Sequence, residues 1–341
     1  MKTHRVYIPE PNQAFLAEQD LDERLKPTEV LIKTHYSAIS AGTETARYMG
    51  LEGPSIFPTT SGGANVGEIV AIGSDVKGFA VGDLVTSFTN HDSYLKCDTV
   101  PVTYGYNGHR IGVKVPADVP GAHATLAYHF AISMAGVRES DVTLGDETLV
   151  IGGGLIGNTA AQLFRCAGAF VMLSDISEAR LKTARACGIS ATVNPTQEKL
   201  PEAVKRWTDG RMLRHVILAV EGAELLAESI PLLGNRGQMI LLGGYRRPYS
   251  ADVGKIFSSL QGASQRIIVV SGPSFLVAES PFYRFSNLGH FRQILTLMQE
   301  RRLLAEPLIT FVRPQDCQQV FQDLIHHKDK YLGAVFDWTK Q

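Results

Sequence analysis

A glycine-rich turn between an apolar run and a helical pattern is the stretch best suited to chemistry. Residues 148–151 are apolar or β-branched, and Gly-Gly-Gly-Leu-Ile-Gly follows directly at 152–157. Gly152 permits a tight turn out of a strand, and Gly154 lets backbone approach a pyrophosphate. Gly157 allows the following helix to pack closely on a sheet. Because free N–H groups at the start of a helix attract phosphate, this spacing predicts a dinucleotide site.

An acidic residue follows at the distance that such a site requires. A second apolar run covers residues 170–173, and Asp175 comes eighteen residues after Gly157. A carboxylate at this point accepts hydrogen bonds from both ribose hydroxyls of the adenosine and repels a 2′-phosphate. Ser174 and Arg180 flank the acid and offer contacts to a phosphate instead. The carboxylate favours NAD(H) over NADP(H).

Three further sets of residues are expected to contact this cofactor. Residues at the start of the helix should face the pyrophosphate and the nicotinamide, and residues after the acid should flank the adenosine. Backbone at the ends of two later strands should meet the nicotinamide carboxamide, because the carboxyl ends of parallel strands share one edge. In that order the sets are Leu155 and Ile156, then Ile176 and Arg180, then Gly243, Gly244 and Ser271.

The elements that position these residues predict an α/β protein with two domains. Residues 123–273 alternate strand and helix patterns, which is typical of a doubly wound sheet of about six parallel strands. Residues 1–122 contain many short strand patterns separated by glycine turns, as in a compact barrel. The tail, 274–341, mixes helix and strand patterns. We expect it to return to the first domain, so that 1–122 and 274–341 form one domain and 123–273 the other.

Composition narrows the class of partner. The 341 residues include 33 basic and 34 acidic ones, for a net charge of −1, so there is no excess charge to attract nucleic acid or an anionic membrane. No apolar run is long enough to span a bilayer, and the start lacks the apolar core of a signal peptide. The four cysteines are scattered, without a CxxC pair. These features predict a soluble, cytoplasmic protein with reduced thiols and a small-molecule substrate.

Taken together, the motifs resemble the medium-chain dehydrogenase/reductase superfamily, which includes the zinc alcohol dehydrogenases. The resemblance extends over almost the whole chain and implies a GroES-like β-barrel catalytic domain joined to a Rossmann domain, with the active site in the cleft between them. The matching segments are Ala-Gly-Thr-Glu at 41–44, the GxIVxxGxxVxxFxxGDxV pattern at 67–85, LGDETLVIGGGLIG at 144–157, SDISEARLKTARACG at 174–188, Pro-Leu-Ile-Thr at 307–310 and Val-Phe-Asp-Trp at 335–338.

The chain departs from the zinc-type members of this superfamily at the positions of the metal ligands. Those members carry a cysteine where this chain has Ala41, and a Gly-His-Glu triplet where it has Gly62-Gly63-Ala64. Residues 124–126 offer no soft donor for a third ligand, and only Cys97 remains of a four-cysteine structural site. Because a catalytic zinc needs three protein ligands, the comparison implies a zinc-free member. The segments 37–44 and 336–338 resemble the bacteriochlorophyllide dehydrogenase-like branch.

Without zinc, hydrogen-bond donors must polarise the substrate oxygen, and the resemblance offers three candidates. Thr43 aligns with the hydroxyl that begins the proton relay of zinc members, and alternatively caps a turn. Glu44 aligns with an acid beside their metal, and acts here as a general acid/base or only in an ion pair, for example with Arg47. His91 follows a barrel strand, and its unperturbed pKa of about 6.5 suits proton transfer, although a loop histidine is often only a surface residue.

The leading hypothesis is a zinc-independent, NAD(H)-dependent oxidoreductase that moves a hydride between the nicotinamide and a small-molecule alcohol or carbonyl. One alternative is a zinc-free enoyl or quinone reductase that uses NAD(P)H. Another is a non-catalytic dinucleotide-binding protein. The β-branched run at 266–271 predicts a strand at the sheet edge, which needs cover, so we also expect a homodimer.

Overall fold

The computed structural model describes the chain except residues 52–56, 101–109, 223, 245–248, 271–285 and 341. The chain divides into two compact units. The barrel unit comprises Met1–Tyr128, Leu276–Arg301 and Leu308–Gln341, and the parallel-sheet unit comprises His129–Phe275 and Arg302–Pro307. Each unit is described by itself.

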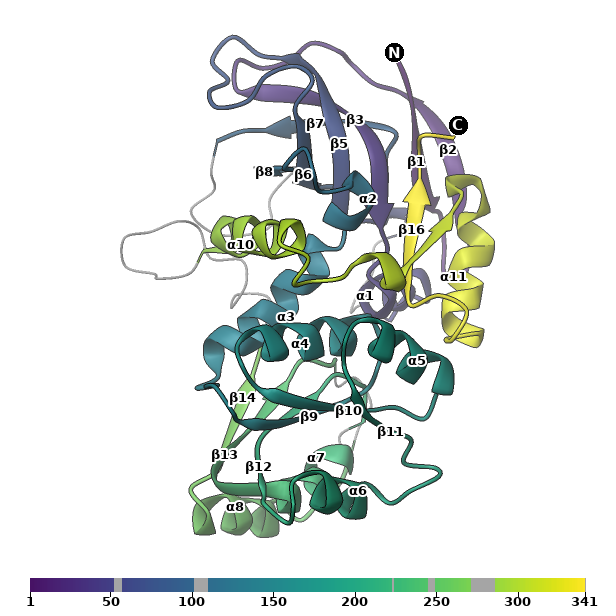
Figure 1. The fold of residues 1–341 in the computed structure, drawn as a ribbon. Coiled ribbons are helices and arrows are strands. Elements are labelled where there is room, and N and C mark those ends of the chain that lie inside the picture. The colour runs from purple at the N-terminus through teal and green to yellow at the C-terminus, as the bar shows by residue number, and fades with distance from the viewer. Residues whose placement is uncertain (52–56, 101–109, 223, 245–248, 271–285, 341) are drawn as a thin grey trace. The chain divides into compact units, whose positions relative to one another are not determined.

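The barrel unit contains the predicted GroES-like barrel (Figure 1). Its largest sheet has the order β15-β16-β3-β5-β6-β8-β7, and β7 also pairs with β3, which closes five strands on themselves. Apolar side chains that include Val30, Ile69 and Leu95 fill the interior. The strands are β3 (Glu29–Ala38), β5 (Ala64–Ile72), β6 (Leu84–Phe88), β7 (Tyr94–Asp98), β8 (Arg110–Lys114), β15 (Ile309–Val312) and β16 (Gly333–Asp337).

Smaller elements complete the barrel unit. A separate antiparallel sheet has the order β2-β1-β4, and a second apolar cluster forms where Tyr48 stacks on Phe321, with ring centroids 5.1 Å apart. The elements are β1 (Lys2–Ile8), β2 (Phe15–Asp20), β4 (Thr59–Thr60), α1 (Ala41–Tyr48), α2 (Gly121–Ala124), α10 (Asn287–Gln299), η3 (Pro314–Asp316) and α11 (Cys317–His326), and the short η2 (Glu306–Leu308) includes residues of both units. The sequence did not predict α1, because Gly42 and Thr43 are poor helix formers in its first turn.

The parallel-sheet unit contains the predicted doubly wound sheet. Six parallel strands have the order β11-β10-β9-β12-β13-β14. Leu149 lies in one apolar cluster and Val150 in another, so the sheet is buried on both faces. The strands are β9 (Glu147–Ile151), β10 (Phe170–Ser174), β11 (Ala191–Val193), β12 (Leu213–Leu218), β13 (Leu233–Leu241) and β14 (Arg266–Val269). The helices are α3 (Ala127–Glu139), α4 (Leu155–Cys166), α5 (Glu178–Ala186), α6 (Leu200–Trp207), α7 (Glu224–Ser229), η1 (Ile230–Leu232) and α8 (Val253–Gly262).

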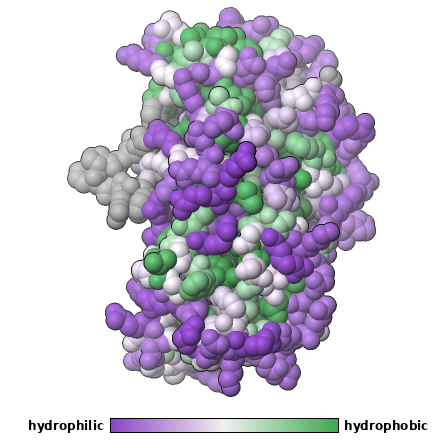
Figure 2. Space-filling model, viewed as in Figure 1, coloured by the Kyte–Doolittle hydropathy of each residue, from purple (hydrophilic) through white to green (hydrophobic). Residues whose placement is uncertain are grey.

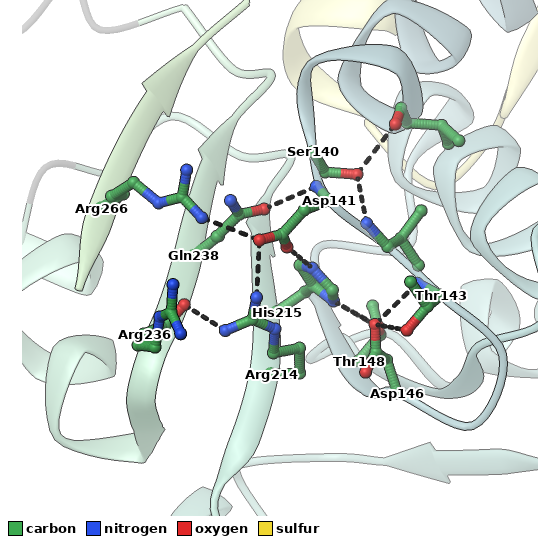
Figure 3. Close-up of polar contacts among 12 residues, drawn as sticks. Ser140, Asp141, Thr143, Asp146, Thr148, Arg214, His215, Arg236, Gln238 and Arg266 are labelled. Atoms are coloured by element: carbon green, nitrogen blue, oxygen red, sulfur yellow. Dashed lines mark hydrogen bonds and ion pairs between the residues drawn. The ribbon is translucent and has the colours of Figure 1, made fainter. Parts of the chain in front are cut away.

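Asp141 makes hydrogen bonds to three strands of this sheet, near their amino ends (Figure 3). Its carboxylate accepts hydrogen bonds from Arg214 Nη2 at 2.5 Å and from Arg266 Nη2 at 2.7 Å. The other carboxylate oxygen lies 3.3 Å from His215 Nε2, and the Asp141 main-chain N–H donates to Gln238 Oε1 at 3.0 Å. The turn after α3 is therefore attached to β12, β13 and β14 at the edge opposite their carboxyl ends.

No helix among the described residues has the length and apolar character needed to cross a membrane. The face of the molecule in Figure 2 is largely hydrophilic, and its hydrophobic residues are scattered among polar ones.

Candidate functional site

The glycine turn between β9 and α4 has a different physical requirement at each position. Gly152 has φ +102°, and a Cβ there would lie 2.3 Å from Val220 Cγ1. A Cβ on Gly157 would lie 1.7 Å from the Gly152 carbonyl oxygen, which is backbone and cannot move aside. A Cβ on Gly154, by contrast, would meet no atom within 4 Å. Gly152 and Gly157 are thus required by the fold, whereas Gly154 leaves open space at the start of α4.

Asp175 follows β10, and its carboxylate is held against this turn. One oxygen accepts a hydrogen bond from the Gly153 N–H at 2.6 Å, and the other accepts from the Ser177 N–H at 2.8 Å. Arg180 Nη1 lies 3.6 Å from the first oxygen, and Asp175 is only 6% exposed. A carboxylate has about four lone-pair sites, so this orientation leaves acceptor capacity for hydroxyl groups beside the turn.

The other residues expected at the cofactor lie around this turn where the structure describes them. Leu155 and Ile156 begin α4 and are half-buried, and Ile176 is 71% exposed directly after the acid. Gly243 follows β13, and a Cβ there would lie 2.5 Å from the Val220 carbonyl oxygen. Gly244 is exposed. Ser271 lies outside the described residues.

A second polar cluster lies inside the barrel unit and joins Glu44 to His91. Glu44 lies in the first turn of α1, and His91 lies between β6 and β7. His91 Nε2 is 2.9 Å from Glu44 Oε2, and the side chains are 0% and 1% exposed respectively. The Ser40 N–H donates to Glu44 Oε1 at 2.7 Å, and the Ser61 hydroxyl donates to Oε2. The structure therefore gives the Glu44 carboxylate a hydrogen-bonded partner in the His91 ring.

His91 is fixed by its backbone as well as by its ring. Its N–H donates to the Ser61 carbonyl at 2.8 Å, and its carbonyl accepts from the Val6 N–H at 3.0 Å. The ring Nδ1 lies 2.8 Å from Ser37 Oγ, which also accepts from the Trp338 indole N–H at 2.8 Å. Sequence reasoning did not single out Ser37, Ser61 or Trp338. Ser37 and Trp338 do belong to the segments 37–44 and 336–338, which resemble the bacteriochlorophyllide dehydrogenase-like branch.

Burial and hydrogen bonding act in opposite directions on Glu44. Burial alone raises the pKa of its carboxyl, but the interaction with His91 and the hydrogen bonds from Ser61 and Ser40 outweigh burial, so the pKa is lowered. Glu44 is therefore ionised at neutral pH while fully enclosed. Thr43, the residue before it, is exposed. Of the three predicted catalytic residues, only Thr43 presents its side chain to solvent.

The residues at the zinc-ligand positions do not fit a zinc ion. Ala41, Gly63 and Ala64 carry no donor atom in their side chains, and a Cβ on Gly63 would meet nothing within 4 Å. Within the described ranges, no group of three or more His, Cys, Asp or Glu side chains is arranged to hold a metal ion. Cys97 is buried in the barrel core, and burial raises the pKa of its thiol, which disfavours the thiolate.

Comparison with known proteins agrees with this architecture. The family model for the alcohol dehydrogenase GroES-like domain matches residues 26–138, and that for zinc-binding dehydrogenase matches residues 156–274. The sorbitol dehydrogenase of Halalkalibacterium halodurans is 28% identical over 318 residues, which is 85% of this chain and 87% of that protein. The chain belongs to the medium-chain dehydrogenase/reductase superfamily.

Solved structures show the same fold at low identity. Galactitol-1-phosphate dehydrogenase from Escherichia coli superimposes with a TM-score of 0.82 at 18% identity, covering 98% of this chain and 99% of that one. An Escherichia coli alcohol dehydrogenase in complex with NADH gives a TM-score of 0.81 at 18% identity, again covering 98% and 99%. With the family established, the protein is an enzyme of the dehydrogenase/reductase class.

Proposed function

We propose that this enzyme is a zinc-independent, NAD(H)-dependent oxidoreductase that transfers hydride between the nicotinamide and a small-molecule alcohol or carbonyl. The observation that carries the proposal is the Asp175 carboxylate, held beside the glycine turn by the Gly153 and Ser177 N–H groups. A carboxylate so placed binds ribose hydroxyls and repels a 2′-phosphate. The sorbitol dehydrogenase relative and the NADH complex of a protein with this fold support the same reaction class.

The cofactor would supply or accept the hydride, and the protein binds the cofactor. In this proposal the N–H groups at the start of α4 bind the pyrophosphate across the open space above Gly154. Asp175 binds the adenosine ribose, and the exposed face of Ile176 contacts the adenine. The remaining contacts that we propose are Leu155, Ile156, Arg180, Gly243, Gly244 and Ser271.

Proton chemistry at the substrate oxygen is assigned to Thr43. Its hydroxyl is exposed in the first turn of α1, whereas Glu44 and His91 are enclosed behind it. A hydroxyl donor stabilises charge on the oxygen as hydride moves, the task that a metal performs in zinc-type members. The absence of donors at Ala41, Gly63 and Ala64 supports zinc independence, and the segments at 37–44 and 336–338 support the bacteriochlorophyllide dehydrogenase-like branch.

We also propose a homodimer formed through the edge of the parallel sheet. β14 is the last strand in the sheet order, and Val269 on it is 65% exposed. The neighbouring chain segment, α8, exposes Val253 and Phe257. Among the described residues β14 pairs with no further strand, and an edge with exposed apolar side chains requires cover, which in this proposal a second copy supplies.

Cofactor choice is tested by titrating the purified protein with NADH and with NADPH and following cofactor fluorescence. We expect NADH to bind at least about 10-fold more tightly, since each charge-assisted hydrogen bond is worth about 1.5–3 kcal/mol. Asp175→Ser should weaken NADH by about 10-fold or more and remove the discrimination against NADPH. Glu178→Gln, which changes an acid three residues further on, is the matched control and should bind as the unmodified protein does. A preference of the unmodified protein for NADPH would overturn the assignment.

The reaction is tested by a screen of polyols, secondary alcohols and their carbonyl counterparts with NAD+ or NADH, read at the absorbance of NADH. Turnover without added metal, in protein that elemental analysis shows to lack zinc, is the expected result. Stoichiometric zinc would contradict the metal-free mechanism. Tight NADH binding without turnover on any member of the panel would favour the non-catalytic alternative.

A further inference from the structure

We propose that Trp338, Ser37, His91 and Glu44 form one directional hydrogen-bond chain that positions the first turn of α1, and with it Thr43. His91 is then a positioning residue and not a group that touches substrate. The inference rests on the proposed role of Thr43, and it goes further by assigning a task to four enclosed side chains.

The direction of each hydrogen bond follows from the donors available. The Trp338 indole N–H can only donate, so Ser37 Oγ accepts it at 2.8 Å. The Ser37 hydroxyl hydrogen is then available to His91 Nδ1, also at 2.8 Å. With Nδ1 accepting, the proton of a neutral His91 resides on Nε2 and is donated to Glu44 Oε2 at 2.9 Å. Every polar atom along this path is satisfied with the neutral Nε2–H tautomer.

The hydrogen-bond chain connects parts of the barrel unit that are distant in sequence. Trp338 follows β16, Ser37 is on β3, His91 lies between β6 and β7, and Glu44 is on α1. Ser37 and Trp338 alone are 301 residues apart. Both ends of the His91–Glu44 pair are enclosed, and in such surroundings a hydrogen bond is electrostatically stronger than in water. The network therefore fixes α1 to the barrel with little freedom.

α1 depends on such support because of its own sequence. It has eight residues, too few for a helix to be stable by itself, and the Ser40 side chain makes no capping hydrogen bond. Glu44 instead reaches back to the residue before the helix, where its Oε1 accepts the Ser40 N–H at 2.7 Å, as one half of a capping box does. Because Thr43 directly precedes Glu44, the orientation of the Thr43 hydroxyl depends on where the Glu44 carboxylate is held.

Amide hydrogen exchange of α1 tests the hydrogen-bond chain without any substrate. His91→Leu should raise the exchange rates of the α1 amides by about 10-fold or more, because Glu44 loses its main donor. His91→Gln, whose amide can still donate to Glu44, should restore most of the protection. Trp338→Phe keeps an aromatic ring beside Phe336 and should show an intermediate effect. This variant replaces His91→Leu in the test if His91→Leu fails to fold.

Tyr48→Phe is the matched control for these exchange measurements. Tyr48 lies at the other end of α1, and its hydroxyl donates to the Asn12 carbonyl at 2.5 Å, which is not part of the hydrogen-bond chain. Its loss should affect the last turn of the helix and leave the first turn protected. Unchanged α1 exchange in both His91→Leu and Trp338→Phe would overturn the hydrogen-bond chain.

A double-mutant cycle tests whether the chain acts through Thr43, using the alcohol of highest turnover in the screen. His91→Leu should lower kcat about 10-fold or more, with Kd for NADH unchanged within about 2-fold. The same substitution should have little further effect in a Thr43→Val background. Independent, multiplicative losses would overturn positioning of Thr43. Unchanged turnover in Thr43→Val alone would instead overturn the proposed role of Thr43. The exchange data would still test the hydrogen-bond chain.

Discussion

At the scale of single residues, two glycines three positions apart, Gly154 and Gly157, have different physical requirements. A methyl group on Gly157 would overlap the Gly152 carbonyl oxygen at 1.7 Å, while a methyl group on Gly154 would meet nothing within 4 Å. Gly157 is required by the packing of α4 on the sheet, and Gly154, in the function that we propose, keeps space free for the cofactor. The two roles separate in experiment because one affects stability and the other affects binding.

We predict that Gly157→Ala lowers the free energy of unfolding by about 3 kcal/mol or more, since neither backbone segment can move away. Gly154→Ala should change stability by less than about 0.5 kcal/mol yet weaken NADH binding about 10-fold or more, because its methyl group occupies the cofactor's space. Urea unfolding and NADH titration of both variants check this. Equal effects of the two substitutions on stability would contradict the assignment.

The enclosed carboxylate of Glu44 predicts a particular dependence of stability on pH. Its pKa is lowered in the folded protein by His91, Ser61 and Ser40, which together outweigh burial. The stabilisation is thus complete above the unfolded-state pKa of about 4.3, and it is lost as pH falls through the lower folded-state value.

Glu44→Gln should accordingly cost about 2–3 kcal/mol of unfolding free energy at pH 7, and the difference from the unmodified protein should diminish below about pH 4.3. Urea unfolding of both proteins between pH 7 and pH 3.5 measures this difference in the free energy of unfolding. Glu139→Gln, at an exposed carboxylate, should change stability little at any pH. A Glu44→Gln penalty that grows toward acid pH would show that the carboxyl is protonated at neutrality.

At the scale of elements, the amino ends of β12, β13 and β14 are held by a network that also contains a buried histidine (Figure 3). Burial lowers the pKa of His215, although its hydrogen bond to Asp141 and the charges of Asp146 and Asp141 act to raise it, while the Arg214 charge lowers it further. The unfolded chain therefore binds a proton at His215 at higher pH than the folded protein does. Stability should fall as pH decreases from about 6.5 toward the folded-state pKa.

We predict that His215→Gln removes this part of the acid sensitivity. One proton corresponds to at most about 1.4 kcal/mol per pH unit, so the unmodified protein should lose stability more steeply than the variant between pH 7 and pH 5. Thermal unfolding across that range tests it. His327→Gln, at an exposed histidine after α11, is the control and should follow the unmodified protein. Parallel curves for His215→Gln and the unmodified protein would show that His215 does not titrate differently on folding.

At the scale of the whole molecule, the proposed dimer depends on apolar side chains that the single chain leaves exposed. Phe257 on α8 and Val269 on β14 are 63% and 65% exposed. Phe257→Glu together with Val269→Lys should convert a dimer into a monomer of 37.2 kDa, because charges in an apolar interface are costly to bury. Sedimentation velocity measures the mass. Val81→Glu, at an equally exposed apolar residue in the barrel unit, should remain dimeric. A monomeric unmodified protein at micromolar concentration would contradict the dimer.

Much of the fold was predictable because its signals are local. The strand–turn–helix–strand pattern around Gly152–Gly157 and the acid at Asp175 depend on residues close in sequence, and the six-stranded parallel sheet follows from repetition of such units. The sequence likewise predicted the barrel strands, since glycine turns separate them. α1 was missed because its helix is stabilised by a carboxylate bound to other segments and not by its own propensity.

The sequence by itself determined the class of enzyme, the glycine turn between a strand and a helix, and the missing side-chain donors at Ala41, Gly63 and Ala64, because each is a matter of residue type at a local spacing. Only the tertiary structure decided that Glu44 and His91 are a fully enclosed pair, with Ser37, Ser61 and Trp338 as partners. A residue's burial and its hydrogen-bond partners are set by which distant segments pack together. No spacing along the chain reveals that a histidine at 91 meets a tryptophan-bound serine and a glutamate on a helix.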